Sequence, residues 1–358
     1  MKILLLAADA YGGRGGIALY TRDTVQALAE MPEVERVVVI PRSVPMEPRG
    51  IPQKVHFVTG AAGSKARYLL FALRAAVNQY DLVICGHINL LPLAHILNRL
   101  ICAPLVLMVY GIDVWDQPKR ITQWQLRQLS SIWSISAVTM ERMNAWVNLP
   151  ESKYAVLPNA IHLEKYGVGE KRRDLLAKYG LCDAKVIMTL ARLSAAERYK
   201  GLDEVLNVMP GLLKLEPRLK YVIAGDGDDR PRLEARVRSL GLEDKVVFAG
   251  MVEEKDKADV LRLADAFVMP GSGEGFGFVF LEALACGIPV VGSRIDGSRE
   301  ALRFGMLGTL VDPRDPRCIQ QGILEALGKR PEIPAGIEHF SWPAFSTRVS
   351  ASVMKLMK

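Results

Sequence analysis

Short apolar runs alternate with longer amphipathic segments along almost the whole chain. Runs such as 2–7, 82–85 and 105–109 have the length and the apolar content of buried strands. Segments such as 17–31 and 65–79 instead place apolar residues at helical spacing, which is typical of helices with one buried face. This strand-then-helix alternation predicts parallel sheets that are covered by helices on both faces.

The alternation occurs twice, on either side of a polar stretch at 162–178. We therefore predict an α/β protein with two doubly wound, Rossmann-like domains, residues 1–163 and 164–338, which face each other across a deep cleft. A last helix within 339–358 is expected to pack back on the first domain. Further strands are predicted at 37–40, 55–58, 132–135, 154–157, 186–190, 221–224, 246–248, 266–269 and 290–292, and further helices at 90–100, 138–147, 202–215, 230–240, 255–264, 299–304 and 316–327.

The stretch 268–292 has the pattern strand, glycine-rich loop, helix and strand. Four glycines fall within 271–277, and each weakens a helix or strand unless the backbone must approach something closely. The amides of Gly275, Phe276 and Gly277 are expected at the positive end of the helix, where they suit an anionic group. Glu274 in the loop and Glu282 in the helix have seven residues between them. A solvated surface position is the alternative interpretation for a single helical glutamate such as Glu282.

A second glycine-rich loop, Tyr11-Gly-Gly-Arg-Gly-Gly16, follows the first predicted strand and precedes a helix. Strand, glycine loop and helix in this order form a phosphate cradle in many nucleotide-binding proteins. The loop does not match G-x-G-x-x-G, so a tight turn without a ligand is the alternative.

Charge and composition limit the partners. The net charge of +7 and the pI near 9.1 favour anionic partners such as nucleotides, acidic glycans or a phospholipid surface. We expect no nucleic acid partner, because no recognition motif accompanies the charge. Five scattered cysteines without metal-binding spacing indicate reduced thiols in a cytosolic protein.

Membrane attachment is expected to be peripheral at most. No apolar run reaches the roughly 18 residues of a membrane span, and the first apolar run is too short for a signal peptide. The helix at 65–79 carries Arg67, Tyr68, Phe71 and Arg74, a mixture that suits the inner face of a membrane. An ordinary half-buried helix is the alternative. We therefore expect a cytoplasmic protein, soluble or attached to the inner membrane face.

Five stretches occur together in one order: the Gly-Gly-Arg-Gly-Gly loop, Leu157-Pro-Asn159, Ala191-Arg-Leu with Tyr199-Lys-Gly-Leu-Asp203, Ala224-Gly-Asp-Gly227, and the Glu-x7-Glu stretch with its Glu-Gly-Phe-Gly core. In this combination the chain resembles the retaining glycosyltransferases of family 4, which have the GT-B fold. The resemblance covers most of the chain and is strongest over 186–312. It implies an enzyme that transfers a hexose from a nucleotide-sugar.

The resemblance also implies site roles. Arg192 and Lys200 would clamp the diphosphate, Glu282 would bind the ribose, and Glu274 would lie near the hydroxyls of the donor sugar. The remaining positions that it assigns to donor binding are Gly15 and Gly16 of the first loop, Gly225, Met251 and Val252 near the base, and Gly275, Phe276 and Gly277 beside the sugar and phosphates.

The expected chemistry is front-face attack with retention, in which the leaving phosphate accepts the proton of the acceptor and an α-linkage forms. Retaining glycosidases use a carboxylate nucleophile instead, but the resemblance gives neither glutamate of the Glu-x7-Glu stretch that role. The chain departs from the family at Tyr110-Gly-Ile-Asp113, where relatives often have His-Gly-x-Asp. Tyr110 and Asp113 are the catalytic candidates of the first domain, and His87 is a candidate for a sugar or acceptor contact.

Asp226-Gly-Asp228 has the form of a metal-binding D-x-D motif, but it directly precedes a predicted helix, where aspartates cap free amides. We therefore expect no essential metal and no cofactor. The donor is predicted to be GDP-mannose or a UDP-sugar, and the acceptor a glycan or lipid-linked molecule of polysaccharide or glycoconjugate synthesis. A small soluble acceptor, or nucleotide-sugar binding without catalysis, is the alternative.

Overall fold

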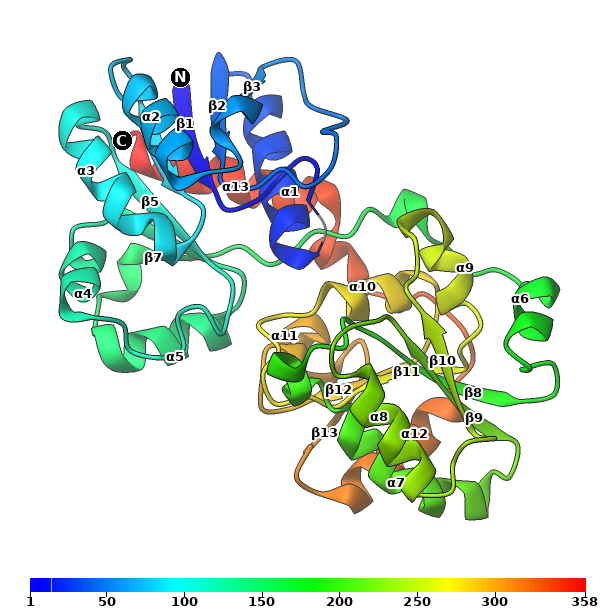
Figure 1. Ribbon diagram of the computed structural model, residues 1–358. Coiled ribbons are helices and arrows are strands. Elements are labelled where there is room, and N and C mark those ends of the chain that lie inside the picture. The colour runs from blue at the N-terminus through cyan, green and yellow to red at the C-terminus, as the bar shows by residue number, and fades with distance from the viewer. Residues whose placement is uncertain (14) are drawn as a thin grey trace. The chain divides into compact units, whose positions relative to one another are not determined.

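The computed structural model describes residues 1–13 and 15–358, which form two compact units (Figure 1). Unit 1 comprises residues 1–160 and 342–358, and unit 2 comprises residues 161–341. Both are doubly wound α/β units, which confirms the predicted fold class. The chain passes between the units twice, near residues 161 and 341. The amide of Ile161 donates a hydrogen bond of 2.7 Å to the carbonyl of Phe340, so both connecting segments begin within unit 2. The unit boundaries consequently lie a few residues from those expected at 163 and 339.

Unit 1 is built on a parallel sheet whose order is β3-β2-β1-β4-β5-β6-β7 within the described residues. The chain runs outward from β1 to β3 and returns on the other side of β1 at β4, so a topological switch point lies between β1 and β4. The strands are β1 (Lys2–Ala7), β2 (Arg36–Pro41), β3 (Val55–Phe57), β4 (Leu82–Cys85), β5 (Leu105–Val109), β6 (Ser131–Ser134) and β7 (Tyr154–Val156).

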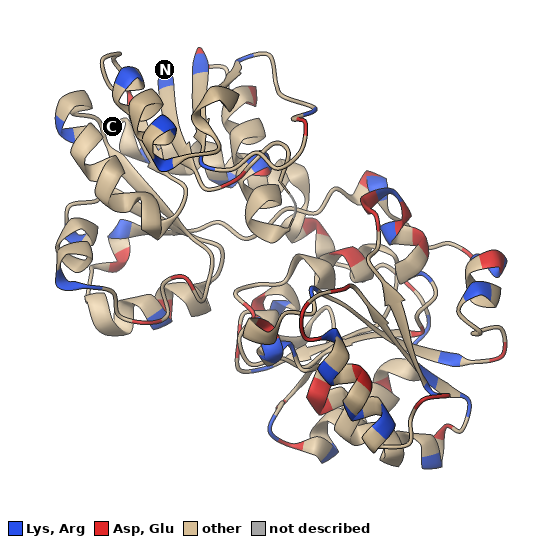
Figure 2. Cartoon of the chain, in the orientation of Figure 1, with Lys and Arg blue, Asp and Glu red and all other residues tan. Residues whose placement is uncertain are grey.

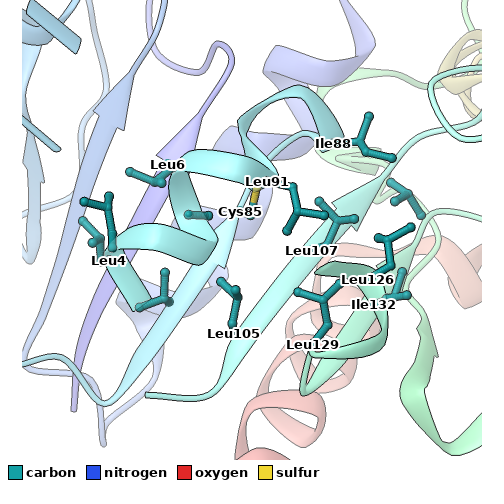
Figure 3. Packing of buried hydrophobic residues seen from close by; sticks show 14 of the residues in the cluster. Leu4, Leu6, Cys85, Ile88, Leu91, Leu105, Leu107, Leu126, Leu129 and Ile132 are labelled. Carbon is teal, nitrogen blue, oxygen red and sulfur yellow. The ribbon is translucent and has the colours of Figure 1, made fainter. Parts of the chain in front are cut away.

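The helices of unit 1 cover this sheet and enclose an apolar core. Figure 3 shows part of that core, where Leu4, Leu107 and Leu126 come from separate strands and helices and are fully buried. The helices are α1 (Gly16–Glu30), α2 (Lys65–Ala75), α3 (Leu91–Ile101), α4 (Arg120–Arg127), α5 (Ala137–Val147) and α13 (Trp342–Leu356). Helix α13 packs against α1, where Tyr20 and Phe345 meet edge to face with ring centroids 5.7 Å apart.

Unit 2 repeats the architecture with the strand order β10-β9-β8-β11-β12-β13 within the described residues, and its switch point lies between β8 and β11. The strands are β8 (Lys185–Leu190), β9 (Leu219–Ala224), β10 (Val246–Gly250), β11 (Ala266–Met269), β12 (Val290–Ser293) and β13 (Thr309–Val311). The helices are α6 (Arg173–Lys178), α7 (Leu202–Leu215), α8 (Arg230–Ser239), α9 (Lys257–Leu261), α10 (Phe278–Ala285), α11 (Ser298–Ala301) and α12 (Pro316–Leu327).

The structure differs from the predicted elements where the periodicity is short or interrupted. Helix α2 ends at Ala75 rather than at 79, and Val77 beyond it is 85% exposed. The helix predicted at 299–304 is divided into α11 and a 3-10 turn, because Phe304 has a φ of 55° that no α-helix continues through. Helices α4 and α6 and strand β13 were not predicted, since each is too short to show a period.

Among the described residues, no helix is both long and apolar enough to cross a lipid bilayer.

Candidate active site

The carboxyl ends of β8, β9, β11 and β12 bring the glycine-containing loops of unit 2 to one edge of its sheet. Gly225, directly after β9, has a φ of 125°, and a Cβ there would lie 1.8 Å from the carbonyl oxygen of Ala191. Its amide donates to the carbonyl of Gly250 at 2.7 Å. Gly225 is therefore required by the close approach of three strand ends, whatever ligand it also touches.

The loop of Glu274 is held in place by backbone contacts on both sides. Ser272 donates its amide to the carbonyl of Tyr199 at 2.7 Å, and a Cβ on Gly273 would lie 2.5 Å from the Tyr199 ring. On the other side, the amide of Glu274 donates to Oδ2 of Asp296 at 2.9 Å, and its carbonyl accepts from the amide of Gly297 at 2.8 Å. The glycines thus allow the loop to lie against the Tyr199 segment.

Asp296 is a structural residue of the site that sequence reasoning missed. It is fully buried after β12, and its other oxygen accepts from the amide of Ser298 at 3.0 Å. The only sequence signal was its place just beyond a predicted strand, in Ser-Arg-Ile-Asp-Gly297. Its two amide contacts fix the position of the Glu274 loop.

The carboxylate of Glu274 has unused hydrogen-bonding capacity. Its Oε2 is buried and has no hydrogen-bond partner among the residues that the structure describes. Burial raises the pKa of Glu274, the charge of Lys200 opposes this rise, and Asp296 adds to it. A buried oxygen without a partner costs free energy unless a ligand satisfies it, so this oxygen suits a hydroxylated ligand.

Helix α10 begins without a side-chain cap. Its N-cap Gly277 has a φ of 92°, and the amides of Gly275, Phe276 and Gly277 donate to no acceptor in the described part of the chain. The ring of Phe276 is buried and meets Phe340 edge to face at 5.4 Å, so only the backbone of Phe276 is available to a ligand. Unpaired amides at a helix N-terminus form an anion site.

Glu282 is not the solvated surface residue that was the alternative interpretation. It is 4% exposed, and its Oε1 accepts from the hydroxyl of Tyr166 at 3.0 Å and from Nζ of Lys257 at 2.8 Å. Burial raises the pKa of Tyr166, with Glu282 adding to the rise, so the hydroxyl stays a donor. Burial works against the charge of Lys257, but the carboxylates of Glu282 and Glu254 outweigh it and raise its pKa.

Arg192 and Lys200 meet at a third residue, Glu197. Nζ of Lys200 lies 2.8 Å from Oε2 of Glu197, and the guanidinium of Arg192 contacts Oε1 of the same carboxylate. Burial lowers the pKa of Lys200, Glu274 opposes this effect, and Arg192 adds to it. The structure therefore brings both predicted diphosphate ligands to one place, together with a carboxylate that sequence reasoning did not single out.

Met251 and Val252 directly follow β10, on the same edge of the sheet as Gly225. The side chain of Met251 is 68% exposed. The isolated bridge between Gly225 and Gly250 joins this strand end to β9. The predicted base-reading segment and the Gly225 loop are thus neighbours within unit 2.

Tyr110 and Asp113 form a small cluster at the carboxyl end of β5 in unit 1. The hydroxyl of Tyr110 donates to the carbonyl of Gly86 at 2.9 Å, and its amide donates to Oδ1 of Asp113 at 3.0 Å. Burial raises the pKa of Tyr110, so it stays neutral. Oδ2 of Asp113 is buried without a partner among the described residues, and burial raises its pKa to about 7.

His87 belongs to the same cluster, because its ring stacks on Tyr110 with centroids 6.3 Å apart. His87 is the N-cap of the following 3-10 turn, because its Nδ1 accepts a hydrogen bond of 3.1 Å from the amide of Asn89. Burial lowers the pKa of His87. The neutral ring therefore carries its proton on Nε2 and presents a donor there.

Gly15 and Gly16 begin helix α1. Gly15 is its N-cap with a φ of 92°, and a Cβ built on it would meet nothing within 4 Å. A glycine is needed at this position for its backbone conformation rather than for lack of space. Arg14, in the middle of the predicted phosphate loop, lies outside the described residues.

The capping role expected for Asp226 and Asp228 is wrong. The N-cap of α8 is Asp229, which makes no capping bond, whereas Asp226 accepts from the neighbouring amide of Gly227 and Asp228 accepts from the amide of Ala195 at 2.9 Å. The two carboxylates therefore bind amides of the loops after β9 and β8 and not the free amides of α8. Within the described residues, no group of three or more His, Cys, Asp or Glu side chains is placed to hold a metal ion.

Comparison with known families adds independent information. The family described as "Glycosyl transferases group 1" matches residues 174–335, and "Glycosyltransferase Family 4" matches residues 14–165. The first region lies within unit 2, and the second lies in unit 1 except for its last residues, 161–165.

Curated relatives are similar over part of their length. The GDP-mannose-dependent alpha-(1-6)-phosphatidylinositol monomannoside mannosyltransferase of Mycolicibacterium smegmatis is 31% identical over 186 residues, which is 50% of this chain and 48% of that protein. The D-inositol 3-phosphate glycosyltransferase of Geodermatophilus obscurus is 33% identical over 201 residues, which is 52% of this chain and 44% of that protein. The chain thus spans about half the length of the curated relatives it matches.

Solved structures share the fold over the full chain. HepE from Anabaena in complex with UDP and glucose has a TM-score of 0.74 at 20% identity, with 99% of both chains covered. WaaG, a glycosyltransferase involved in lipopolysaccharide biosynthesis, has a TM-score of 0.67 at 16% identity, again with 99% of both chains covered. At these identities the likeness concerns the fold alone.

Proposed function

Because the chain belongs to the family 4 glycosyltransferases and has their GT-B fold, we propose that it transfers a hexose from a nucleoside-diphosphate sugar to a glycan or lipid-linked acceptor. One observation carries the proposal. The free amides at the start of α10, the unpartnered oxygen of Glu274 and the cations Arg192 and Lys200 lie on loops of one sheet edge of unit 2. An anionic group with a hydroxylated neighbour satisfies all of them at once.

The donor is proposed to lie along helix α10. The diphosphate accepts hydrogen bonds from the amides of Gly275, Phe276 and Gly277 and ion pairs with Arg192 and Lys200. Glu274 accepts from hydroxyls of the sugar. Glu282, about one turn into the helix, offers its second oxygen to the ribose while Tyr166 and Lys257 hold the first.

The reaction proceeds by front-face attack with retention of configuration and gives an α-linkage. The leaving diphosphate gains negative charge in the transition state, and the helix start and the two cations stabilise that charge. A leaving-group oxygen accepts the acceptor's proton, so no protein carboxylate needs to act as nucleophile. Unit 1 is proposed to contribute Gly15 and Gly16, together with Tyr110, Asp113 and His87, to the reaction. The charge stabilisation requires no metal ion or other cofactor.

The donor is proposed to be GDP-mannose or a UDP-sugar. The relative from Mycolicibacterium smegmatis is named as GDP-mannose-dependent, whereas HepE binds UDP and glucose. Met251 and Val252 follow β10 and would meet the base through their backbone, so their side chains favour neither base. Thermal denaturation with UDP and with GDP separates the two, because a ligand that binds only the folded state raises the melting temperature.

Unit 1 carries a surface that suits a peripheral membrane contact and hence a lipid-linked acceptor. Helix α2 buries Tyr68 and Ala72 but exposes Leu69, Leu70 and Leu73 by 45%, 47% and 43%. Helix α3 packs beside α2 and helix α4 packs beside α3, and these two helices expose further apolar side chains, Ile96, Leu100, Ile121 and Trp124. Figure 2 shows Lys and Arg distributed over the same three helices. Apolar side chains among cations favour the anionic inner face of a membrane.

Incubation with GDP-mannose and with UDP-glucose tests the activity, because glycosyltransferases of this kind slowly hydrolyse their donor when no acceptor is present. Release of GDP or UDP and of free sugar is expected from the wild-type protein and not from the Lys200→Ala variant. Binding of a nucleotide without any release would instead indicate a nucleotide-sugar-binding protein. Flotation with anionic and with neutral vesicles tests the membrane contact. Attachment to anionic vesicles that weakens with salt is expected.

A further inference from the structure

Glu197 occupies the place between the two cations that the proposed function assigns to the diphosphate. Its carboxylate contacts Nζ of Lys200 at 2.8 Å through one oxygen and the guanidinium of Arg192 through the other. The residue is 9% exposed and interrupts the 3-10 segment Ala195–Lys200 with a φ of −118° and a ψ of 28°. The two positive charges are therefore bridged by an internal anion.

The two contacts of Glu197 are not equivalent. The side chain of Lys200 is 14% exposed, so its pair with Glu197 is enclosed by protein. The side chain of Arg192 is 71% exposed, so it can leave the carboxylate without moving the backbone. Separating an enclosed pair leaves a buried charge without its partner, which costs much free energy, whereas breaking an exposed contact costs little. Arg192 is consequently the partner that an incoming anion can capture.

We propose that Glu197 is a positioning residue that exchanges Arg192 with the diphosphate of the nucleotide. Before the donor binds, Glu197 holds both cations near their working positions and limits their mutual repulsion. When the donor binds, Arg192 transfers from the carboxylate to the phosphates, while Lys200 stays paired with Glu197 and contacts the phosphates with its remaining hydrogens. No covalent bond changes in this exchange.

The exchange has a consequence for product release. The negative charge of Glu197 remains beside the diphosphate after transfer of the sugar, and it competes for Arg192 with the nucleoside diphosphate product. Without this competitor, the product would be held by both cations at full strength. Glu197 therefore weakens binding of the product and speeds its release, which limits turnover in many enzymes. This inference rests on the proposed function, because it takes the diphosphate as the ligand of Arg192 and Lys200.

The test compares Glu197→Gln with wild type by calorimetric titration with UDP, GDP and inorganic pyrophosphate. Glutamine keeps the shape and removes the charge, so the dissociation constants for pyrophosphate and for the bound nucleotide are expected to fall about three- to tenfold. Stopped-flow measurement is expected to show correspondingly slower nucleotide dissociation. Unchanged or weaker binding by Glu197→Gln overturns the proposal, since a purely structural residue would not give tighter binding on mutation.

Glu234→Gln is the matched control. It removes the same charge from unit 2, from an ion pair of 2.8 Å with Arg230, and it is expected to leave the affinities unchanged. Equal gains in both variants would indicate a general charge effect and overturn the proposal. In an Arg192→Gln background, the gain from Glu197→Gln is expected to shrink, because the exchanged partner is absent. A full gain in that background also overturns the exchange.

Two further outcomes are distinguishable. If Glu197→Gln fails to fold, Glu197→Asp replaces it. The shorter side chain keeps the charge but loses contact with Arg192, and an affinity equal to or weaker than that of wild type overturns the exchange. Nucleotide binding by wild type without a gain in the variant overturns this inference alone. A wild-type protein that binds neither UDP nor GDP overturns the proposed function as well.

Discussion

Replacing Glu282 by Gln separates ribose binding from catalysis. The carboxylate is enclosed, with its side chain 5% exposed, and both of its protein contacts are made by Oε1. The proposed ribose contact is therefore made by Oε2, to which no side chain of the described residues hydrogen-bonds. Glutamine preserves the shape, and its amide oxygen still accepts a hydrogen bond from the hydroxyl of Tyr166. The variant therefore removes the charge and replaces the acceptor at Oε2 by an amide group that only donates.

The size of the effect follows from these contacts. A hydrogen bond to a charged acceptor contributes roughly 1.5–3 kcal/mol, and about 1.4 kcal/mol corresponds to a factor of ten in affinity. We therefore expect the dissociation constant of the nucleotide to rise between about 10- and 150-fold. Lys257 keeps its contact of 2.7 Å with Glu254, so the free energy of unfolding should fall by only about 1–2 kcal/mol rather than the roughly 3–5 kcal/mol of a buried charge left alone.

Calorimetric titration with the nucleotide, urea denaturation and steady-state donor hydrolysis measure the three quantities. A ribose contact is made in the ground state and the transition state alike, so KM should rise while kcat is nearly unchanged. Glu254→Gln is the control, since Glu254 is 76% exposed and contacts Lys257 without touching Glu282. A collapse of kcat with unchanged nucleotide affinity, or a covalent glycosyl adduct on Glu282, would refute the reasoning.

Three further predictions concern other parts of the site. Asp113→Asn should flatten the pH dependence of the melting temperature. The raised pKa means that folded wild type holds the proton more tightly than the unfolded chain, so wild type should lose stability as pH rises from about 4 to about 7; a parallel loss in the variant would contradict this. Gly297→Ala would place a Cβ 2.1 Å from the carbonyl of Gly275 and should destabilise the protein by about 1–3 kcal/mol and weaken donor binding. Gly328→Ala, whose Cβ meets only ordinary contacts from 3.5 Å, should change neither quantity, and equal effects of the two variants would exclude the steric explanation. Donor hydrolysis should persist in EDTA, and activity that is abolished by EDTA and restored by magnesium would show that a metal ion takes part.

The local sequence determined the elements and their order. Strand and helix periods are local properties, because each residue's burial depends on the face that it occupies within its own element. Strands β1, β4, β5 and β11 and helices α7 and α12 have the predicted bounds. The sequence shows that positions 225, 273 and 297 are glycines, but only the structure shows that they lie against Ala191, Tyr199 and Gly275, respectively.

The chemistry of the site depends on contacts between segments that lie far apart in the sequence. The sequence singled out Arg192, Lys200 and the two glutamates by their motifs, yet it gave no sign that Glu197 joins the two cations. The sequence did not indicate the roles of Asp296 and Lys257 either, because a single charged residue in a loop or a short helix forms no repeating pattern. Which charges meet depends on how the ends of separate strands are aligned by the packing of the whole sheet. The sequence alone therefore identified the fold and the family likeness, whereas the tertiary structure selected the partners of each charge.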